Sequence, residues 1–140
     1  MTAVHAARNA RQVSVFEASE EHVEITRNAA RRNNVAGRIN VYHGLVGPEM
    51  RVHGPTANAP VIEPEDLPSA NVLEMDIEGA ELHVLENLQF RPRVMIVESH
   101  PQLKSPDSAV RSAIERLDYQ IESTEQMGGG DNSLFVARRQ

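Results

Sequence analysis

The sequence predicts an α/β fold in which strands alternate with helices. Short apolar runs typical of buried strands lie at 12–16, 38–42, 72–76 and 94–98. Helical patterns follow the first and the third of these runs. Such alternation favours a mostly parallel sheet that is covered on both faces. At 140 residues, the chain fits a single domain that spans 1–140.

The first half of the chain contains two helical patterns and a long loop. Residues 2–11 favour a short helix with one apolar face. Ser19 can cap a second helix that extends to about Asn33, and acids in its first turn favour the helix dipole. Residues 44–69 hold five prolines and are predicted to form a loop, in which Met50–His53 and Val61–Ile62 are candidates for a small hairpin.

The second half is predicted to contain two helices and a terminal hairpin. A helix from about Gly79 to Leu88 should bury a stripe of leucines, and Ser105 should cap the next helix, with Pro106 at its first position. The last two apolar segments have no helix between them, so they should pair antiparallel. These segments are Tyr119–Ile121 and Ser133–Ala137, joined by a glycine-rich loop.

Composition excludes several kinds of partner and site. Acids outnumber bases by 20 to 14, which argues against nucleic acid as the partner. The absence of cysteine excludes disulfides and thiolate zinc sites. No apolar run approaches the roughly 18–20 residues that a membrane span needs, so no membrane partner is expected. The first residues lack the apolar core of a secretory signal, and we expect a cytoplasmic protein.

Ionisable residues follow two neighbouring strands where each strand ends. Asp76 and Glu78 flank the turn after the third strand, with Glu81 one turn on, and Glu98 and His100 end the fourth. Ligands bind outside the carboxyl ends of parallel strands, which lie ~4.8 Å apart, so these side chains can converge. A histidine beside a carboxylate is a general base or a metal ligand. The alternative is that the acids only stabilise a helix N-terminus.

Glu17 ends the first strand and is a second candidate. An acid at this place can accept hydrogen bonds from ribose hydroxyls, as in dinucleotide-binding folds. The alternative is a solvated acid before a turn. The remaining histidines have no such carboxylate partner in the sequence and are expected at the surface or its boundary: His5, His22, His43, His53 and His83.

The order of these pieces resembles the FkbM family of S-adenosylmethionine-dependent methyltransferases. The resemblance covers about residues 1–101, and its matching residues are Val15–Ser19, Asn28, Asn34, Asp76–Glu81 and Ile96–Pro101. It implies a Rossmann-like class I methyltransferase sheet with strand order 3-2-1-4-5-7-6 and an antiparallel C-terminal hairpin. The family's first strand and glycine-rich cofactor turn would precede residue 2. The chain is therefore expected to be N-terminally truncated and to lack the first strand.

The resemblance also implies roles for these residues. The expected reaction is methyl transfer from S-adenosylmethionine to an oxygen, as O-methylation of a hydroxyl on a small-molecule or glycan acceptor. Glu17 and Asp76 are then expected to contact the cofactor, and Glu78 and His100 the acceptor. Asp76, Glu98 and His100 are the expected catalytic residues, with His100 or Asp76 as the base and Glu98 orienting it. No metal is expected in this interpretation.

Two consequences and two alternatives accompany this interpretation. Without the glycine turn, the chain should bind the cofactor weakly or not at all. Without the central strand, open strand edges should favour a homo-oligomer. One alternative is a non-catalytic remnant or interaction module of the same fold. The other is a metal-dependent hydrolase that uses Asp76, Glu78, Glu98 and His100.

Overall fold

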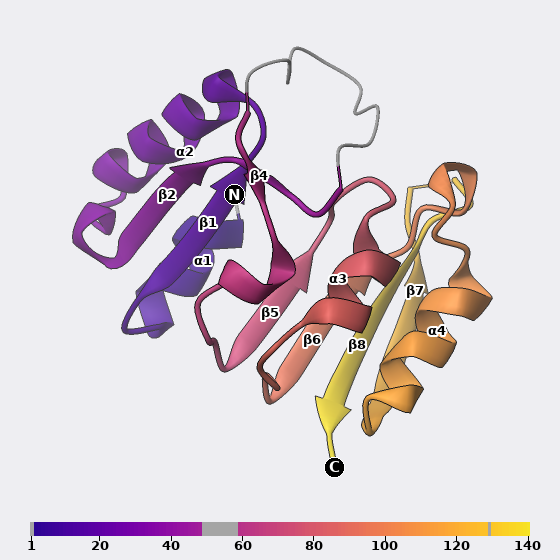
Figure 1. Cartoon of the computed structure of the whole chain (residues 1–140). Helices are drawn as coiled ribbons and strands as arrows, with labels where there is room; N and C mark the ends of the chain where they lie inside the picture. Colours follow the sequence, from indigo (N-terminus) through magenta and orange to yellow (C-terminus); the bar gives the residue numbers. More distant parts are fainter. Residues whose placement is uncertain (1, 49–58, 129) are drawn as a thin grey trace. The chain divides into compact units, whose positions relative to one another are not determined.

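A computed structural model describes residues 2–48, 59–128 and 130–140 (Figure 1). The chain divides into two compact units, Met1–Ile62 and Glu63–Gln140. No helix in the described ranges is both long enough and apolar enough to cross a membrane.

The N-terminal unit is built on two parallel strands. β1 (Val13–Glu17) pairs with β2 (Ile39–His43) in parallel, so that Glu17 lies opposite His43. α1 (Thr2–Asn9) precedes β1, and α2 (Glu20–Arg32) connects the strands. Ser19 caps α2 as predicted, because its hydroxyl accepts a hydrogen bond from the backbone N–H of His22.

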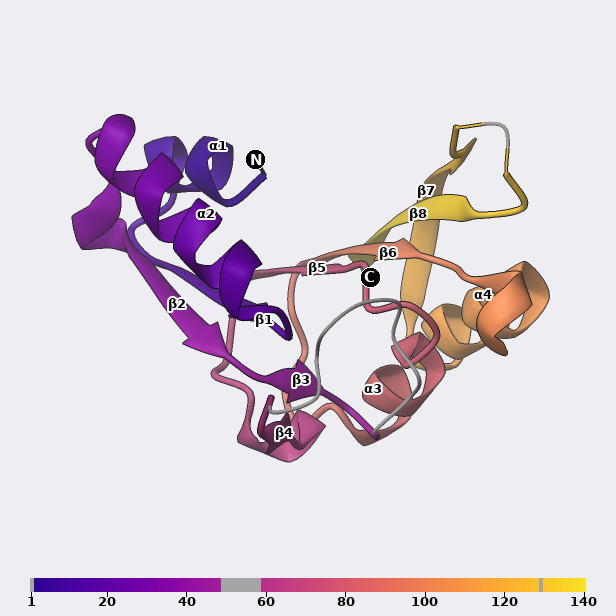
Figure 2. The same ribbon diagram turned by 90° about the horizontal axis from the view of Figure 1, so that it is seen from above.

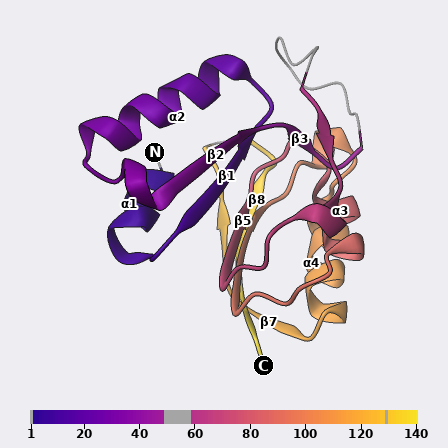
Figure 3. The same ribbon diagram turned by 60° about the vertical axis from the view of Figure 1, so that its left-hand side comes forward.

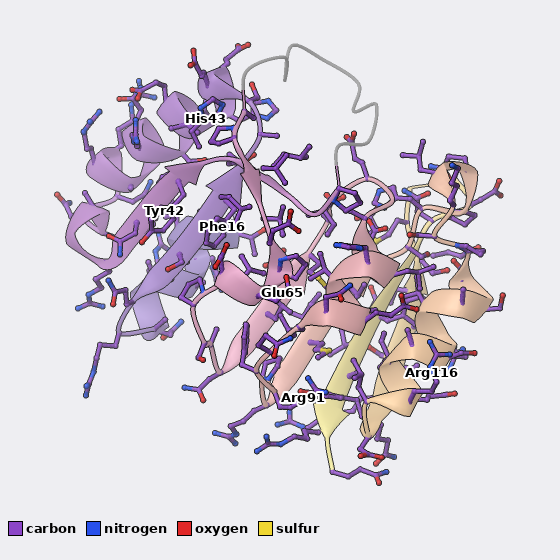
Figure 4. All side chains as sticks on the ribbon, viewed as in Figure 1. Phe16, Tyr42, His43, Glu65, Arg91 and Arg116 are labelled. Carbon is purple, nitrogen blue, oxygen red and sulfur yellow. The ribbon has the colours of Figure 1, made fainter. Side chains whose placement is uncertain are left out.

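Both helices of this unit lie on one face of the β1–β2 sheet (Figures 2 and 3). The alternation of strand residues explains this arrangement, because every second side chain faces the helices. The buried cluster on that face comprises Val4, Ala7, Ala30, Val35 and Ile39. On the opposite face Phe16 stacks on its register partner Tyr42, with ring centroids 5.0 Å apart (Figure 4).

The segment after β2 contains strands that the sequence prediction paired differently. β3 (Leu45–Val46) and β4 (Val61–Ile62) pair in parallel. Val61–Ile62 is therefore a strand as predicted, but its partner is β3. The other half of the predicted hairpin, 50–53, lies outside the described residues. Close approach at Gly44 supports this pairing, since a Cβ there would lie 2.3 Å from the side chain of Ile62.

The C-terminal unit is a four-stranded sheet with the order β5-β6-β8-β7. β5 (Val72–Met75) and β6 (Val94–Glu98) are parallel, and β8 (Ser133–Arg139) runs antiparallel to both β6 and β7 (Tyr119–Gln126). The predicted terminal hairpin is thus confirmed and is longer than predicted. The order also matches the 4-5-7-6 part of the arrangement that the resemblance implied.

The helices of this unit, α3 (Glu81–Asn87) and α4 (Asp107–Arg116), lie on one face of its sheet (Figure 3). The described residues also form three short 3₁₀ helices: Ala36–Arg38 in the first unit, and Pro64–Asp66 and Pro101–Leu103 in the second. The buried side chains of the core include Leu85, Met95, Val97, Ile114 and Phe135.

Two details of these helices differ from the sequence prediction. Ser105 does not cap α4, whose N-cap is Pro106; the Ser105 hydroxyl instead donates to the carbonyl oxygen of Gly79 at 3.0 Å. In α3, Leu82 is only half-buried, while Glu81 is completely buried. The stripe that faces the core therefore includes an acid.

Candidate functional site

The carboxyl ends of β5 and β6 bring three predicted residues together. Met75 pairs with Val97 in the parallel register, so Asp76 emerges from β5 beside Glu98 at the end of β6. His100 follows two residues later. One ligand-type atom from each of Asp76, Glu98 and His100 lies within 4.8 Å of the others. The prediction that Asp76 and Glu98 share one sheet edge is confirmed.

His100 is held on its Nδ1 side by Glu81. Nδ1 lies 2.7 Å from Oε1 of Glu81, and the two side chains are 7% and 0% exposed. The same Oε1 accepts the backbone N–H of Gly79 at 3.1 Å. A carboxylate oxygen only accepts hydrogen bonds, so the ring nitrogen next to it must be the donor. This contact places a proton on Nδ1. In the neutral ring, Nε2 then carries the lone pair.

The Nε2 side of the imidazole faces the other two carboxylates. Nε2 lies 3.4 Å from Oδ1 of Asp76 and 4.0 Å from Oε1 of Glu98. Glu98 Oε1 also accepts a hydrogen bond from the side-chain amide of Asn132 at 3.0 Å. Glu98 therefore lies beside the reactive nitrogen, and the orienting contact to the ring comes from Glu81.

The backbone around His100 is fixed by Ser105. His100 and Ser105 exchange two backbone hydrogen bonds, at 3.0 and 3.1 Å, and so form an isolated bridge. The Ser105 hydroxyl continues this link to the Gly79 carbonyl at 3.0 Å. Ser105 thus ties the loop after β6 to the turn before α3, which positions His100 against Glu81.

The turn between β5 and α3 adopts an uncommon conformation. Glu78 has a φ of 50°, which is unfavourable for a residue with a Cβ, and Gly79 follows with a φ of 103°. A glycine suits the second of these positions because it has no side chain. The two left-handed residues turn the chain so that Glu81 points into the core.

The site is rich in negative charge. Burial raises the pKa of Asp76, and the charges of Glu98, Glu78 and Glu81 raise it further, while the charge of His100 acts against them. The Asp76 side chain remains 64% exposed, so water screens these effects. Within the described ranges, Oε2 of both Glu78 and Glu81 is buried without a hydrogen-bond partner. A buried carboxylate oxygen without a partner is costly.

An open depression of about 560 Å³ lies next to Glu98. Of the three clustered residues, only Glu98 lines it. Its lining combines the β7–β8 loop with the region after β6: Glu98, Gln102, Met127, Gly128, Gly130, Asp131 and Asn132.

The remaining predicted residues lie as follows. Glu17 is the last residue of β1, at the carboxyl end of that strand as predicted. Two histidines have carboxylate neighbours that the sequence did not reveal: His22 lies 4.0 Å from Glu17, and His43 lies 4.0 Å from Glu20. His22 is exposed, and His43, which is labelled in Figure 4, is half-buried. Both therefore lie at the surface or its boundary, as predicted. His53 lies outside the described residues.

Glu81 is the site residue that the sequence analysis did not select. The sequence places Glu81 one turn into the helix, where an acid also favours the helix N-terminus, and the local pattern does not distinguish an exposed acid from a buried one. One signal points to burial: Glu81 lies three residues before Val84 and four before Leu85, so it falls on the same helix face as these apolar residues.

Comparisons with known proteins agree with this architecture. The sequence matches the family model of the methyltransferase FkbM domain over residues 3–121. A similar fold occurs in the ribosomal protein L11 methylase from Lactobacillus delbrueckii subsp. bulgaricus, at 14% identity and a TM-score of 0.58. That alignment covers 99% of this chain and 64% of the methylase, so the chain spans less than two thirds of that structure.

A second similar fold is that of a geranyl diphosphate methyltransferase solved in complex with SAM. It is 12% identical, with a TM-score of 0.55, and the alignment covers 98% of this chain and 73% of that one. At such identities the likeness concerns the fold alone. No curated protein matches the sequence.

Proposed function

Because the chain belongs to the FkbM methyltransferase domain family, we propose that it transfers a methyl group from S-adenosylmethionine to a hydroxyl oxygen of a small-molecule or glycan acceptor. The observation that carries this proposal is the cluster of Asp76, Glu98 and His100 at the ends of two parallel strands. This is where α/β sheets bind ligands.

The acceptor hydroxyl would sit at Nε2 of His100, next to Asp76. The chemistry is an in-line displacement: the acceptor oxygen attacks the methyl carbon, and the bond from that carbon to the sulfonium sulfur breaks. S-Adenosylhomocysteine leaves. A base at hydrogen-bonding distance from the hydroxyl takes its proton, and Nε2 of His100 is suited to this role because Glu81 holds the proton on Nδ1.

Two further residues have supporting roles in the proposal. Glu17 would accept hydrogen bonds from the ribose hydroxyls of the cofactor, since it ends a parallel strand. Glu78 would contact the acceptor, since it lies in the turn after β5, close enough to Asp76 for its charge to act on that carboxylate.

The test measures cofactor binding and methyl transfer in the presence of a chelator. Binding of S-adenosylmethionine is followed by saturation-transfer NMR, which detects weak ligands. Glu17→Gln should weaken it about tenfold or more, because a hydrogen bond to a charged group contributes roughly 1.5–3 kcal/mol. Glu21→Gln, an exposed acid in the first turn of α2, is the matched control and should leave binding unchanged.

Transfer is measured with a ¹³C-methyl donor and a panel of hydroxyl-bearing small molecules and glycans. Formation of a methoxy signal supports the proposal. Absence of both cofactor binding and methyl transfer would overturn it. Binding without transfer to any acceptor would favour the non-catalytic module.

A further inference from the structure

We propose that Asp76, Glu98 and His100 bind a divalent cation of the Mn²⁺ to Zn²⁺ class at the carboxyl ends of β5 and β6. The inference rests on the proposed function of the same site. It adds a metal ion that would bind the acceptor oxygen directly.

The spacing of the ligand atoms is close to that around a metal ion. Around a cation with bonds of about 2.1 Å, neighbouring ligand atoms lie roughly 3 Å apart and opposite ones roughly 4.2 Å apart. Nε2 of His100 is 3.4 Å from Oδ1 of Asp76 and 4.0 Å from Oε1 of Glu98. Asp76 is mostly exposed, so a small rotation of its side chain can complete the set.

The surrounding hydrogen bonds are those that support metal ligands. A histidine that binds a metal generally donates its other ring N–H to a carboxylate, and ligating carboxylates are themselves hydrogen-bonded. Glu81 takes this position at Nδ1 of His100, and Asn132 donates to Glu98. The metal-facing nitrogen is therefore the one that carries the lone pair.

Uncompensated charge is an independent indication of a cation. Three carboxylates, those of Asp76, Glu81 and Glu98, lie within 4.0 Å of one imidazole, and the charge of Glu78 acts on Asp76. Across the part of the chain that the structure describes, no Arg or Lys forms an ion pair with any of them. Glu81 is completely buried, and its Oε2 has no hydrogen-bond partner in that part of the chain. Like charges in such proximity disfavour one another, and a dication offsets two of them.

The donor set selects the class of metal. Mg²⁺ and Ca²⁺ prefer sites composed of oxygen ligands. Imidazole nitrogen favours later first-row ions such as zinc and iron, while carboxylates also suit manganese. One nitrogen and two carboxylate oxygens therefore favour the Mn²⁺ to Zn²⁺ class over Mg²⁺.

The cation would change how the acceptor loses its proton. With Nε2 of His100 acting as a ligand, the acceptor hydroxyl occupies an open position on the metal, which lowers the pKa of that hydroxyl. The proton passes to bulk water. The acceptor oxygen held there would attack the methyl carbon as the carbon–sulfur bond breaks, and S-adenosylhomocysteine would leave. The cation thus replaces the imidazole in the deprotonation step.

The test titrates chelator-stripped protein with Mn²⁺, followed by EPR of free Mn²⁺, with no methyl donor present. We expect saturable binding of one ion. Asp76→Asn, Glu98→Gln and His100→Gln should each weaken it about 100-fold, and Glu81→Gln about 10–100-fold through the imidazole. Glu86→Gln, on the exposed side of α3, is the control and should stay within about twofold of the parent, since it has no part in the coordination sphere.

The possible outcomes separate the two proposals. Competition by Zn²⁺ but not by Mg²⁺ supports the nitrogen-containing site. Absence of Mn²⁺ binding, or equal binding by the His100→Gln and parent proteins, would overturn the metal site. Circular dichroism checks that each variant is folded, and Asp76→Asn changes an exposed side chain that the fold tolerates. Methyl transfer that persists in chelator would retain the proposed function without the metal.

Discussion

At the scale of single residues, Glu81 determines which nitrogen of His100 can react. A fully buried carboxylate loses its hydration, and hydrogen bonds must offset that loss. Oε1 of Glu81 accepts two, from the backbone N–H of Gly79 and from the imidazole of His100. The same contacts hold the ring in one orientation. Both possible uses of Nε2, as a base and as a ligand, follow from this one acid.

Tyr119 provides a prediction of stability against pH. Tyr119 is 3% exposed, and its hydroxyl donates a hydrogen bond to the carbonyl oxygen of Pro92 at 2.5 Å. Burial raises the pKa of Tyr119 above its ordinary value near 10, while Arg139 and Arg91 act against this shift. Because the folded pKa is raised, the stabilisation is fully present below about pH 10 and is lost as the pH rises through the folded value.

Tyr119→Phe should therefore lower the free energy of unfolding by about 1–3 kcal/mol near pH 7, since it leaves a buried carbonyl without its donor. The gap between the parent and the variant should shrink above about pH 10. Urea unfolding between pH 7 and pH 11 measures both effects. Tyr42→Phe, at a 43% exposed tyrosine, is the control. A gap that stays constant across this range would contradict the assigned role.

At the scale of elements, Asp107 joins α4 to the ends of two strands. Its carboxylate accepts hydrogen bonds from the hydroxyls of Ser99, after β6, and Ser133, at the start of β8. Both serines are almost fully buried. Asp107→Ala should lower the free energy of unfolding by roughly 2–3 kcal/mol, because two charge-assisted hydrogen bonds are lost. Thermal and urea unfolding measure this loss.

The neighbouring Ser108→Ala is the control for this prediction. Ser108 is exposed on the same first turn of α4, and replacement there should change stability by less than about 0.5 kcal/mol. If the two substitutions lower the free energy of unfolding equally, the loss comes from changing the first turn of the helix and does not come from the hydrogen bonds of Asp107.

The elements also show where sequence patterns succeed. The bounds of α2 are predictable to within a residue because Ser19, the acids after it and Asn33 all act locally. α4 was predicted with the wrong cap, because the hydroxyl of Ser105 is used by Gly79, a contact 26 residues away along the chain. The parallel pairing of β3 with β4 was missed for the same reason. The convergence of Asp76 and Glu98 was predictable because it follows from the direction of parallel strands.

At the scale of the whole molecule, the chain contains two cores of different quality. The buried cluster described for Met1–Ile62 consists of small and medium side chains, with alanines at two of the five positions of that cluster. That of Glu63–Gln140 includes larger ones such as Phe135, Leu85 and Met95. Hydrophobic stabilisation increases with the apolar area that is buried, so the second unit should be the more stable. The order of its strands was predictable only through the family resemblance, because spacing alone does not define the neighbour of β6.

Separate cores predict separate unfolding, which hydrogen exchange with mass spectrometry can measure. Leu85 is 1% exposed in the C-terminal unit, and Leu85→Ala should cost about 2–5 kcal/mol by creating a cavity. Amides in β6 and β8 should then exchange faster, while those in β1 and β2 keep the parent rates, because local stability depends on local packing. Ile39→Ala, in the N-terminal core, should have the converse effect. If both variants accelerate exchange equally in all four strands, the chain unfolds as one cooperative body and the two cores are energetically coupled.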